Sequence, residues 1–144
     1  MCVCQIPERW RGLGFLILRI GIGGMFIHHG MGKFLAGSET LTKVGSALSL
    51  VGIHFGPYYF GILAALSEAG GGLCLILGVL FLPACFFMFF TMCIASTMHL
   101  MSGDGLSTAS HAIEAAILFF SLMFIGPGPL AMDNLLRKYC PCKK

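Results

Sequence analysis

The residues that could do chemistry in this sequence are ionisable side chains set within or beside long apolar runs. Arg19, Glu68 and Glu114 lie deep in three such runs. A second polar group lies nearer the ends of the runs and consists of His29, Lys33, His99 and His111. Carboxylates and imidazoles relay protons, and a guanidinium or ammonium group orients a polar ligand by charge-assisted hydrogen bonds. These seven residues are therefore the candidate site residues.

The composition of the chain indicates the solvent in which this chemistry takes place. Charged residues make up 10% of the 144 residues and hydrophobic residues 57%, whereas a soluble domain carries about 25% charged residues. Between residues 57 and 100 the only Asp, Glu, Lys or Arg is Glu68. So few charges cannot cover the surface of a small soluble domain, and they form no basic face for a nucleic acid. The sequence indicates an integral membrane protein.

Four apolar runs are long enough to cross a bilayer as helices. A hydrocarbon core about 30 Å thick needs about 20 apolar residues, and the runs are too unbroken for the alternating strands of a membrane barrel. We expect spans at about 12–32, 57–81, 83–101 and 107–125. Pro57 and Pro83 suit the first turn of a helix, so a tight turn is expected at Leu82-Pro83. The prediction is an all-α membrane protein, a four-transmembrane-helix bundle forming a single domain over residues 1–144.

The long connection between the first two spans has a helical pattern of its own. Leu41, Val44, Leu48 and Val51 recur at helical spacing in segment 35–56. Ser38 is a candidate N-cap residue. We expect a short amphipathic helix that lies on the membrane surface or caps the bundle. After the fourth span, Gly126-Pro127-Gly128-Pro129 predicts the end of the helix because proline cannot continue the hydrogen-bond ladder.

The distribution of basic residues predicts the orientation. With four spans both termini lie on one side, and that side carries six basic residues: Arg9, Arg11, Arg137, Lys138, Lys143 and Lys144. The opposite side offers Lys33 and Lys43. By the positive-inside rule we expect both termini in the cytoplasm of a bacterial cell, with the chain in the inner membrane.

Two ionisable residues are expected to face the interior of the bundle. Glu68 shares a helix face with small residues, which are Gly61, Ala64, Ala65, Gly71 and Gly72. Arg19 shares a face with Gly12, Gly23 and Gly30. Small residues let membrane helices approach closely, so both faces should point inward, and we expect an Arg19–Glu68 interaction. Such a pair either holds the helices in register or serves as a redox-ligand or proton-transfer site.

The remaining candidates are expected to gather near the outer face of the membrane. His29, Lys33, His99, His111 and Glu114 form this set, whereas His28 lies opposite Arg19 on its helix. Three interpretations stay open: ordinary polar residues near loop ends, a pocket for a polar headgroup or quinone ring, and a metal or haem site. The spacing matches no compact ligand motif, so we expect no metal or haem.

The cysteines fall into two groups. Cys74, Cys85 and Cys93 lie in spans and are expected to be packing residues. Cys2, Cys4, Cys140 and Cys142 form two Cys-x-Cys pairs near the ends of the chain, on the same predicted side. We expect free thiols there in a reducing cytoplasm, with a soft-metal site or acylation as the alternatives.

Three short motifs also carry a family resemblance. The first span contains Arg19-Ile20-Gly21-Ile22-Gly23 and then His29-Gly30-Met31-Gly32-Lys33-Phe34. The second contains Glu68-Ala69-Gly70-Gly71-Gly72-Leu73 and then Leu77-Gly78. The fourth is followed by Gly126-Pro127-Gly128-Pro129-Leu130-Ala131-Met132-Asp133. In order and topology these motifs resemble the DoxX family of small four-helix membrane proteins over roughly residues 12–135, with Ala131 in place of the family's serine.

The resemblance implies a function that the spacings alone do not. DoxX-like proteins are associated with quinone-linked oxidation of sulfur compounds, or with membrane complexes that respond to oxidative stress. By this resemblance the chain is a membrane subunit of a quinone-linked redox complex, with membrane lipid, a quinone and soluble redox proteins as partners. Arg19 and His29 would orient the quinone, and Glu68 or Glu114 would relay protons. The alternatives are a non-enzymatic binder or permease for a lipid or small solute, and a membrane anchor for soluble partners.

Overall fold

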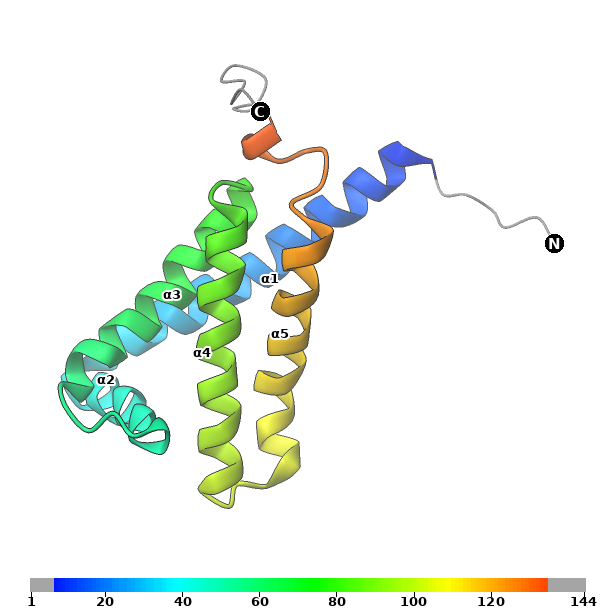
Figure 1. Ribbon diagram of the computed structural model, residues 1–144. Helices are drawn as coiled ribbons and strands as arrows, with labels where there is room; N and C mark the ends of the chain where they lie inside the picture. The colour runs from blue at the N-terminus through cyan, green and yellow to red at the C-terminus, as the bar shows by residue number, and fades with distance from the viewer. Residues whose placement is uncertain (1–6, 135–144) are drawn as a thin grey trace.

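The computed structural model describes residues 7–134 and contains four long helices (Figure 1). They are α1 (Glu8–Leu35), α3 (Pro57–Leu77), α4 (Phe81–Met101) and α5 (Gly105–Ile125). Each is long and apolar enough to cross a membrane. Between α1 and α3 lie the short helix α2 (Gly37–Gly45) and the 3-10 helix η1 (Ser46–Val51). Residues 7–134 contain no strand, and the predicted all-α, four-helix membrane fold is confirmed.

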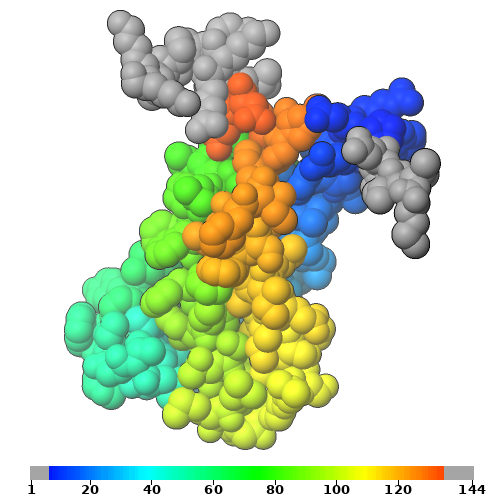
Figure 2. Space-filling view, turned by 45° about the vertical axis from the view of Figure 1, so that its right-hand side comes forward, coloured from blue at the N-terminus to red at the C-terminus, as the bar shows by residue number. Residues whose placement is uncertain are grey.

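The helices form two antiparallel pairs, α1 with α3 and α4 with α5, which are joined through contacts between α3 and α4 (Figure 1). Helices α1 and α5 cross, and the rings of Phe26 and Phe119 meet edge-to-face at the crossing, 4.9 Å between centroids. The start of α1 and the end of α5 lie at the same end of the molecule. Helix α2 and η1 lie toward the opposite end (Figure 2).

Small residues set the spacing of the α1–α3 pair. A Cβ atom added to Gly23 would lie 2.6 Å from the carbonyl oxygen of Gly72, and one added to Gly30 would lie 2.5 Å from the backbone nitrogen of Ala69. Gly12, Arg19, Gly23 and Gly30 on α1 are buried, as are Gly61, Glu68, Gly71 and Gly72 on α3. The predicted inward faces of both helices are therefore confirmed.

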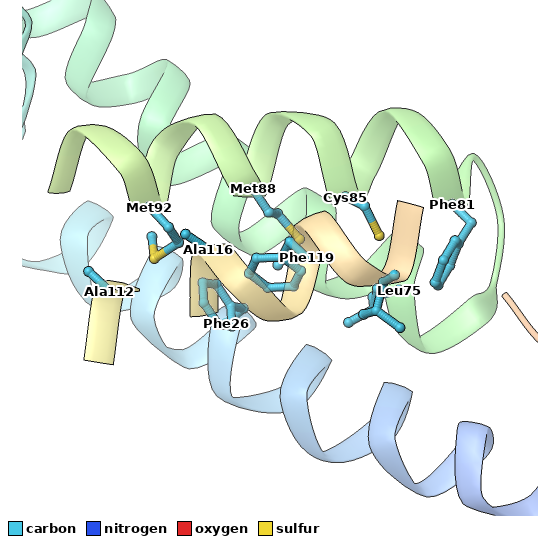
Figure 3. Close-up of a cluster of buried hydrophobic side chains, with 10 residues drawn as sticks. Phe26, Leu75, Phe81, Cys85, Met88, Met92, Ala112, Ala116 and Phe119 are labelled. Atoms are coloured by element: carbon cyan, nitrogen blue, oxygen red, sulfur yellow. The ribbon is translucent and has the colours of Figure 1, made fainter. Parts of the chain in front are cut away.

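The apolar core lies where the two pairs meet, and its side chains come from all four long helices (Figure 3). Its buried members are Phe26, Leu75, Phe81, Cys85, Met88, Met92, Ala112, Ala116, Phe119 and Leu122. Burial of Cys85 in this cluster agrees with its predicted role as a packing residue.

The turn between α3 and α4 comes earlier than the sequence predicted. Helix α3 ends at Leu77, because Gly78 adopts a left-handed conformation with φ 67°, and Leu80 follows with φ 48°. Helix α4 then begins at Phe81, so Pro83 is its third residue and not its first. Proline is tolerated there because the first turn of a helix has no internal acceptor for its N–H groups. The end of α5 at Ile125, just before Gly126, is as expected.

The segment between α1 and α3 forms two short helices where the sequence predicted one. Leu41 and Ala47 are buried and Val44 is half-buried, whereas Val51 is exposed, so the apolar face does not continue to its predicted end. Ser38 is not the N-cap residue, because α2 follows α1 directly after Ala36 and no side chain caps it. Glycines bring α2 against α3: a Cβ atom on Gly61 would lie 1.8 Å from the carbonyl oxygen of Leu41.

Candidate functional site

Arg19 is buried, and its guanidinium is satisfied by backbone carbonyl groups. Nε donates a hydrogen bond to the carbonyl oxygen of Leu75 (2.8 Å), and one terminal nitrogen donates to that of Ile76 (2.6 Å). The other terminal nitrogen donates to the carbonyl oxygens of Pro127 (3.1 Å) and Leu130 (3.3 Å). Arg19 thus joins α1, the end of α3 and the segment that follows α5. This arrangement stabilises the bundle and leaves little of the guanidinium for a ligand.

Asp133 fastens the same segment to the start of α4. Its carboxylate oxygens accept hydrogen bonds from the backbone N–H groups of Leu80 (3.3 Å) and Phe81 (3.2 Å). The backbone N–H of Asp133 donates to the carbonyl oxygen of Gly78 at 2.9 Å. A carboxylate at the N-terminal end of a helix is favoured by the helix dipole and by the free N–H groups there.

The predicted Arg19–Glu68 interaction is wrong. Glu68 forms an ion pair with Lys33 of α1, through Oε2 and Nζ. The Gly23–Gly72 contact places Arg19 level with Ile76 on the antiparallel helix α3. Glu68 is eight residues away from Ile76, about 12 Å at 1.5 Å per residue. Arg19 therefore reaches the carbonyl groups at the end of α3, while Lys33 reaches the carboxylate.

The Lys33–Glu68 pair lies in the wall of a groove of about 790 Å³, here named the α3–α4 groove. Helices α3 and α4 diverge from their shared turn, and α2 and η1 lie near the wide end of the gap between them (Figure 1). Most of the lining is aliphatic or aromatic, for example Leu63, Phe87 and Ile94. The volume falls within the range of about 300–1,000 Å³ that small-molecule sites occupy.

Polar groups occupy two levels of this groove. Near Glu68, the Thr91 hydroxyl donates a hydrogen bond to the Ser67 hydroxyl across the gap between α4 and α3, at 3.1 Å. At the end of the groove next to α2, Thr40 and Lys43 of α2 and His99 of α4 contribute to the lining. His99 Nδ1 lies 2.8 Å from a carboxylate oxygen of Asp104, which is itself exposed.

The seven predicted site residues do not form a single site. Glu68, Lys33 and His99 line the α3–α4 groove, and Arg19 lies outside it. His29, His111 and Glu114 are exposed and do not line the groove. The expectation that His29 turns into the interior is wrong: the residue is exposed, and its ring lies edge-to-face near the rings of Phe26 and His28, 6.1 and 6.0 Å between centroids. His28 is exposed, as expected for the opposite face.

Several side chains that line the groove were not predicted from the sequence. Ser67 precedes Glu68 and Thr91 lies within an aromatic run, so neither stood out among the apolar residues. Cys74, expected to be a packing residue, also lines the groove. Within residues 7–134, His, Cys, Asp and Glu form no group of three suited to hold a metal ion. Cys2, Cys4, Cys140 and Cys142 lie outside the described residues.

Comparison with known proteins places this arrangement in a family. The sequence profile of the DoxX family matches residues 14–100, which include Arg19, Lys33, Glu68 and most of the groove. The chain belongs to the DoxX family. No curated protein and no solved structure matches the chain. The match to the DoxX family ends before α5, so Glu114 and the Asp133 contacts lie outside the matched residues.

Proposed function

We propose that this DoxX-family protein binds a quinone with an apolar tail in the α3–α4 groove and serves as the membrane subunit of a redox complex. The observation that carries the proposal is the position of the Lys33–Glu68 pair, midway along α3 in a largely apolar groove. Glu68 is eleven residues after Pro57, so it lies about 16 Å along a helix of about 31 Å. A charged lipid headgroup stays at the membrane surface, whereas a neutral quinone ring enters the hydrocarbon core.

The residues present fit such a ligand. Lys33 supplies an ammonium group that donates to a ring carbonyl, and its side chain is 24% exposed against 2% for Glu68. Glu68 supplies carboxyl oxygens that can transfer a proton, and its ion pair with Lys33 holds the side chain in place. The Ser67 and Thr91 hydroxyls provide further donors and acceptors at the same level. The apolar lining of α4 covers the tail and excludes water.

Quinone reduction takes up two electrons and two protons. In the proposed complex a soluble partner that carries flavin, haem or an iron–sulfur cluster supplies the electrons. The chain positions the ring, and the Glu68 carboxyl group passes the protons taken up in the reaction to the ring oxygens. We further propose that the complex lies in a bacterial inner membrane with both termini in the cytoplasm, as the basic residues of the two ends favour.

The test is a binding titration of the full chain in lipid nanodiscs with a short-tailed ubiquinone analogue. Glu68→Gln and Lys33→Met each remove one member of the buried pair. We expect the dissociation constant to rise about tenfold in each, because one charge-assisted hydrogen bond to the ligand is lost. Glu39→Gln on the exposed side of α2 is the matched control and should bind as the parent does. Equal affinity of the parent and Glu68→Gln contradicts the proposal.

A second candidate occupant is an anionic phospholipid, favoured by Lys43 and Thr40 at the end of the groove that α2 lines. Such a lipid would place its phosphate beside Lys43 and its chains along the apolar lining. Native mass spectrometry distinguishes the two ligands: Lys43→Gln releases a retained phospholipid but leaves quinone affinity unchanged, whereas Glu68→Gln acts in the opposite way.

A further inference from the structure

The outward face of α5 carries an ionisable residue that has no partner in the part of the chain the structure describes. Glu114 is nine residues after Gly105, about 14 Å along a helix of about 31 Å, so it lies near the middle of the span. It is exposed, and it makes no hydrogen bond or ion pair with any residue from 7 to 134. Ala112 and Ala116 are buried on the other side of the helix. A carboxylate that faces lipid at this depth is costly, and such residues normally face protein or water.

Glu114 belongs to a polar stripe with a repeat of seven residues. Ser107 lies one repeat before it and Ser121 one repeat after it, on the same face. Figure 2 shows α5, coloured yellow to orange, uncovered at the surface of the molecule. Small polar side chains at this spacing are typical of a surface that packs against another membrane helix.

The outward face of α1 has a matching repeat of seven residues. Gly14, Gly21, His28 and Leu35 follow one another at this spacing, and all four are exposed. A Cβ atom added to Gly14 or Gly21 would have nothing within 4 Å, so this face of α1 packs against nothing in the described chain. His28 supplies an exposed imidazole on this face.

The two stripes fit in register. Helices α1 and α5 cross the membrane in opposite directions, so copies with the same orientation bring them together antiparallel. Aligning Leu35, the last residue of α1, with Ser107 near the start of α5 places His28 opposite Glu114. The same alignment places Gly21 opposite Ser121, and two small residues allow the helix backbones to approach closely.

We propose that the outward face of α1 in one copy of this chain packs against the outward face of α5 in the next, with His28 paired to Glu114. Both halves of the complementary surface are present on the same chain, which is why a second copy is the occupant. The contact is head-to-tail, so its repetition joins successive copies in the plane of the membrane, as a ring where the rotation between copies closes. The interface lies outside the α3–α4 groove and does not depend on the proposed ligand.

The test measures self-association of the full chain in lipid vesicles, by single-molecule photobleaching over a series of protein-to-lipid ratios. Glu114→His and His28→Glu should each raise the protein-to-lipid ratio at half association by about tenfold, because like groups then face each other. The double exchange His28→Glu with Glu114→His should restore the association of the parent. Circular dichroism checks the fold of each variant, and Glu114→Gln replaces any single variant that is not folded.

A glycine comparison provides an independent arm. Gly21→Leu fills the proposed contact, and Gly70→Leu is the control, because Gly70 is exposed on α3 and a Cβ atom there also meets nothing within 4 Å. Gly21→Leu should weaken association and Gly70→Leu should not. A parent chain that is monomeric at every ratio, a double exchange that does not restore association, or equal effects of the two glycine variants would overturn the proposal.

Discussion

A guanidinium within a membrane helix needs acceptors for its N–H groups. Arg19 donates to four backbone carbonyl groups and not directly to a carboxylate. The acceptors come from the end of α3 and from the segment after α5. Carbonyl groups near the end of a helix lack internal donors, and in hydrocarbon no water is present to replace them. Arg19 therefore satisfies these carbonyl groups as well as its own N–H groups.

Arg19→Lys should lower the free energy of unfolding by about 3 kcal/mol. A single ammonium group cannot reach the acceptors on both α3 and the segment after α5, so some of these carbonyl groups are left unpaired. Thermal or denaturant unfolding in detergent micelles measures the change. Arg11→Lys on the exposed face of the same helix is the control and should stay within about 0.5 kcal/mol of the parent. Equal losses in both variants would refute the structural role of Arg19.

At this scale the sequence predicted which faces of α1 and α3 turn inward but not which side chains meet. Helical periodicity placed Arg19 and Glu68 on inward faces, and both are buried. The axial register depends on backbone contacts between Gly23 and Gly72, which are properties of two helices together. One signal was available: Lys33 follows Arg19 by fourteen residues, which returns it close to the same face of α1.

Among the elements, α2 is held against α3 by backbone contact rather than by a large apolar face. Gly61 and Gly45 lie where α2 and α3 touch, and a Cβ atom on Gly45 would lie 1.7 Å from the carbonyl oxygen of Pro57. Helix α2 also carries Thr40 and Lys43 into the groove lining. The position of α2, and with it the end of the groove that α2 lines, depends on these two glycines.

Gly61→Ala should displace α2 and widen the end of the groove that α2 lines. Because the new methyl group meets a backbone carbonyl that cannot rotate away, we expect a loss of about 1–3 kcal/mol in the free energy of unfolding. Limited proteolysis within residues 46–56 should become faster at the same time. Gly70→Ala is the matched control on α3, and cleavage that speeds up equally in both variants would contradict the assignment.

The lengths of the apolar runs and the prolines and glycines at their ends were enough to predict the four long helices. The same reasoning failed in segment 35–56, where hydrophobic spacing extended the expected helix to Val51. The structure divides the segment because Gly45 and Gly61 pack backbone to backbone, so burial there follows contact with α3 and not the periodicity of the segment itself. The turn before α4 was misplaced for a similar reason, since Gly78 packs against Ala131, a residue far along the chain.

For the molecule as a whole, both ends of the described chain lie on one side of the four spans (Figure 1). The basic residues predict that this side is the cytoplasm, because the opposite side offers only Lys33 and Lys43. Lys33 is further withdrawn from that side by its ion pair with Glu68. The imbalance in free basic charge is therefore larger than the sequence alone suggests.

Green fluorescent protein, which is fluorescent only in the cytoplasm, should be active when it is fused after Lys144. A periplasm-dependent phosphatase inserted at Gly103, in the exposed turn between α4 and α5, should be active as well. The two sites control each other because one span, α5, separates them, so they are expected on opposite sides of the membrane. Phosphatase activity after Lys144 would reverse the proposed orientation.

The contacts of residues 127–133 have a consequence for how the molecule is made. Arg19 is synthesised and inserted early, but two of its four acceptors, the carbonyl groups of Pro127 and Leu130, emerge from the ribosome more than a hundred residues later. Until then part of the guanidinium has no permanent acceptor, and the α3–α4 turn lacks its Asp133 clasp. The synthesis of residues 127–133 thus completes the contacts of Arg19 and of the α3–α4 turn, so a chain cut short after α5 is expected to be a substrate for membrane quality control.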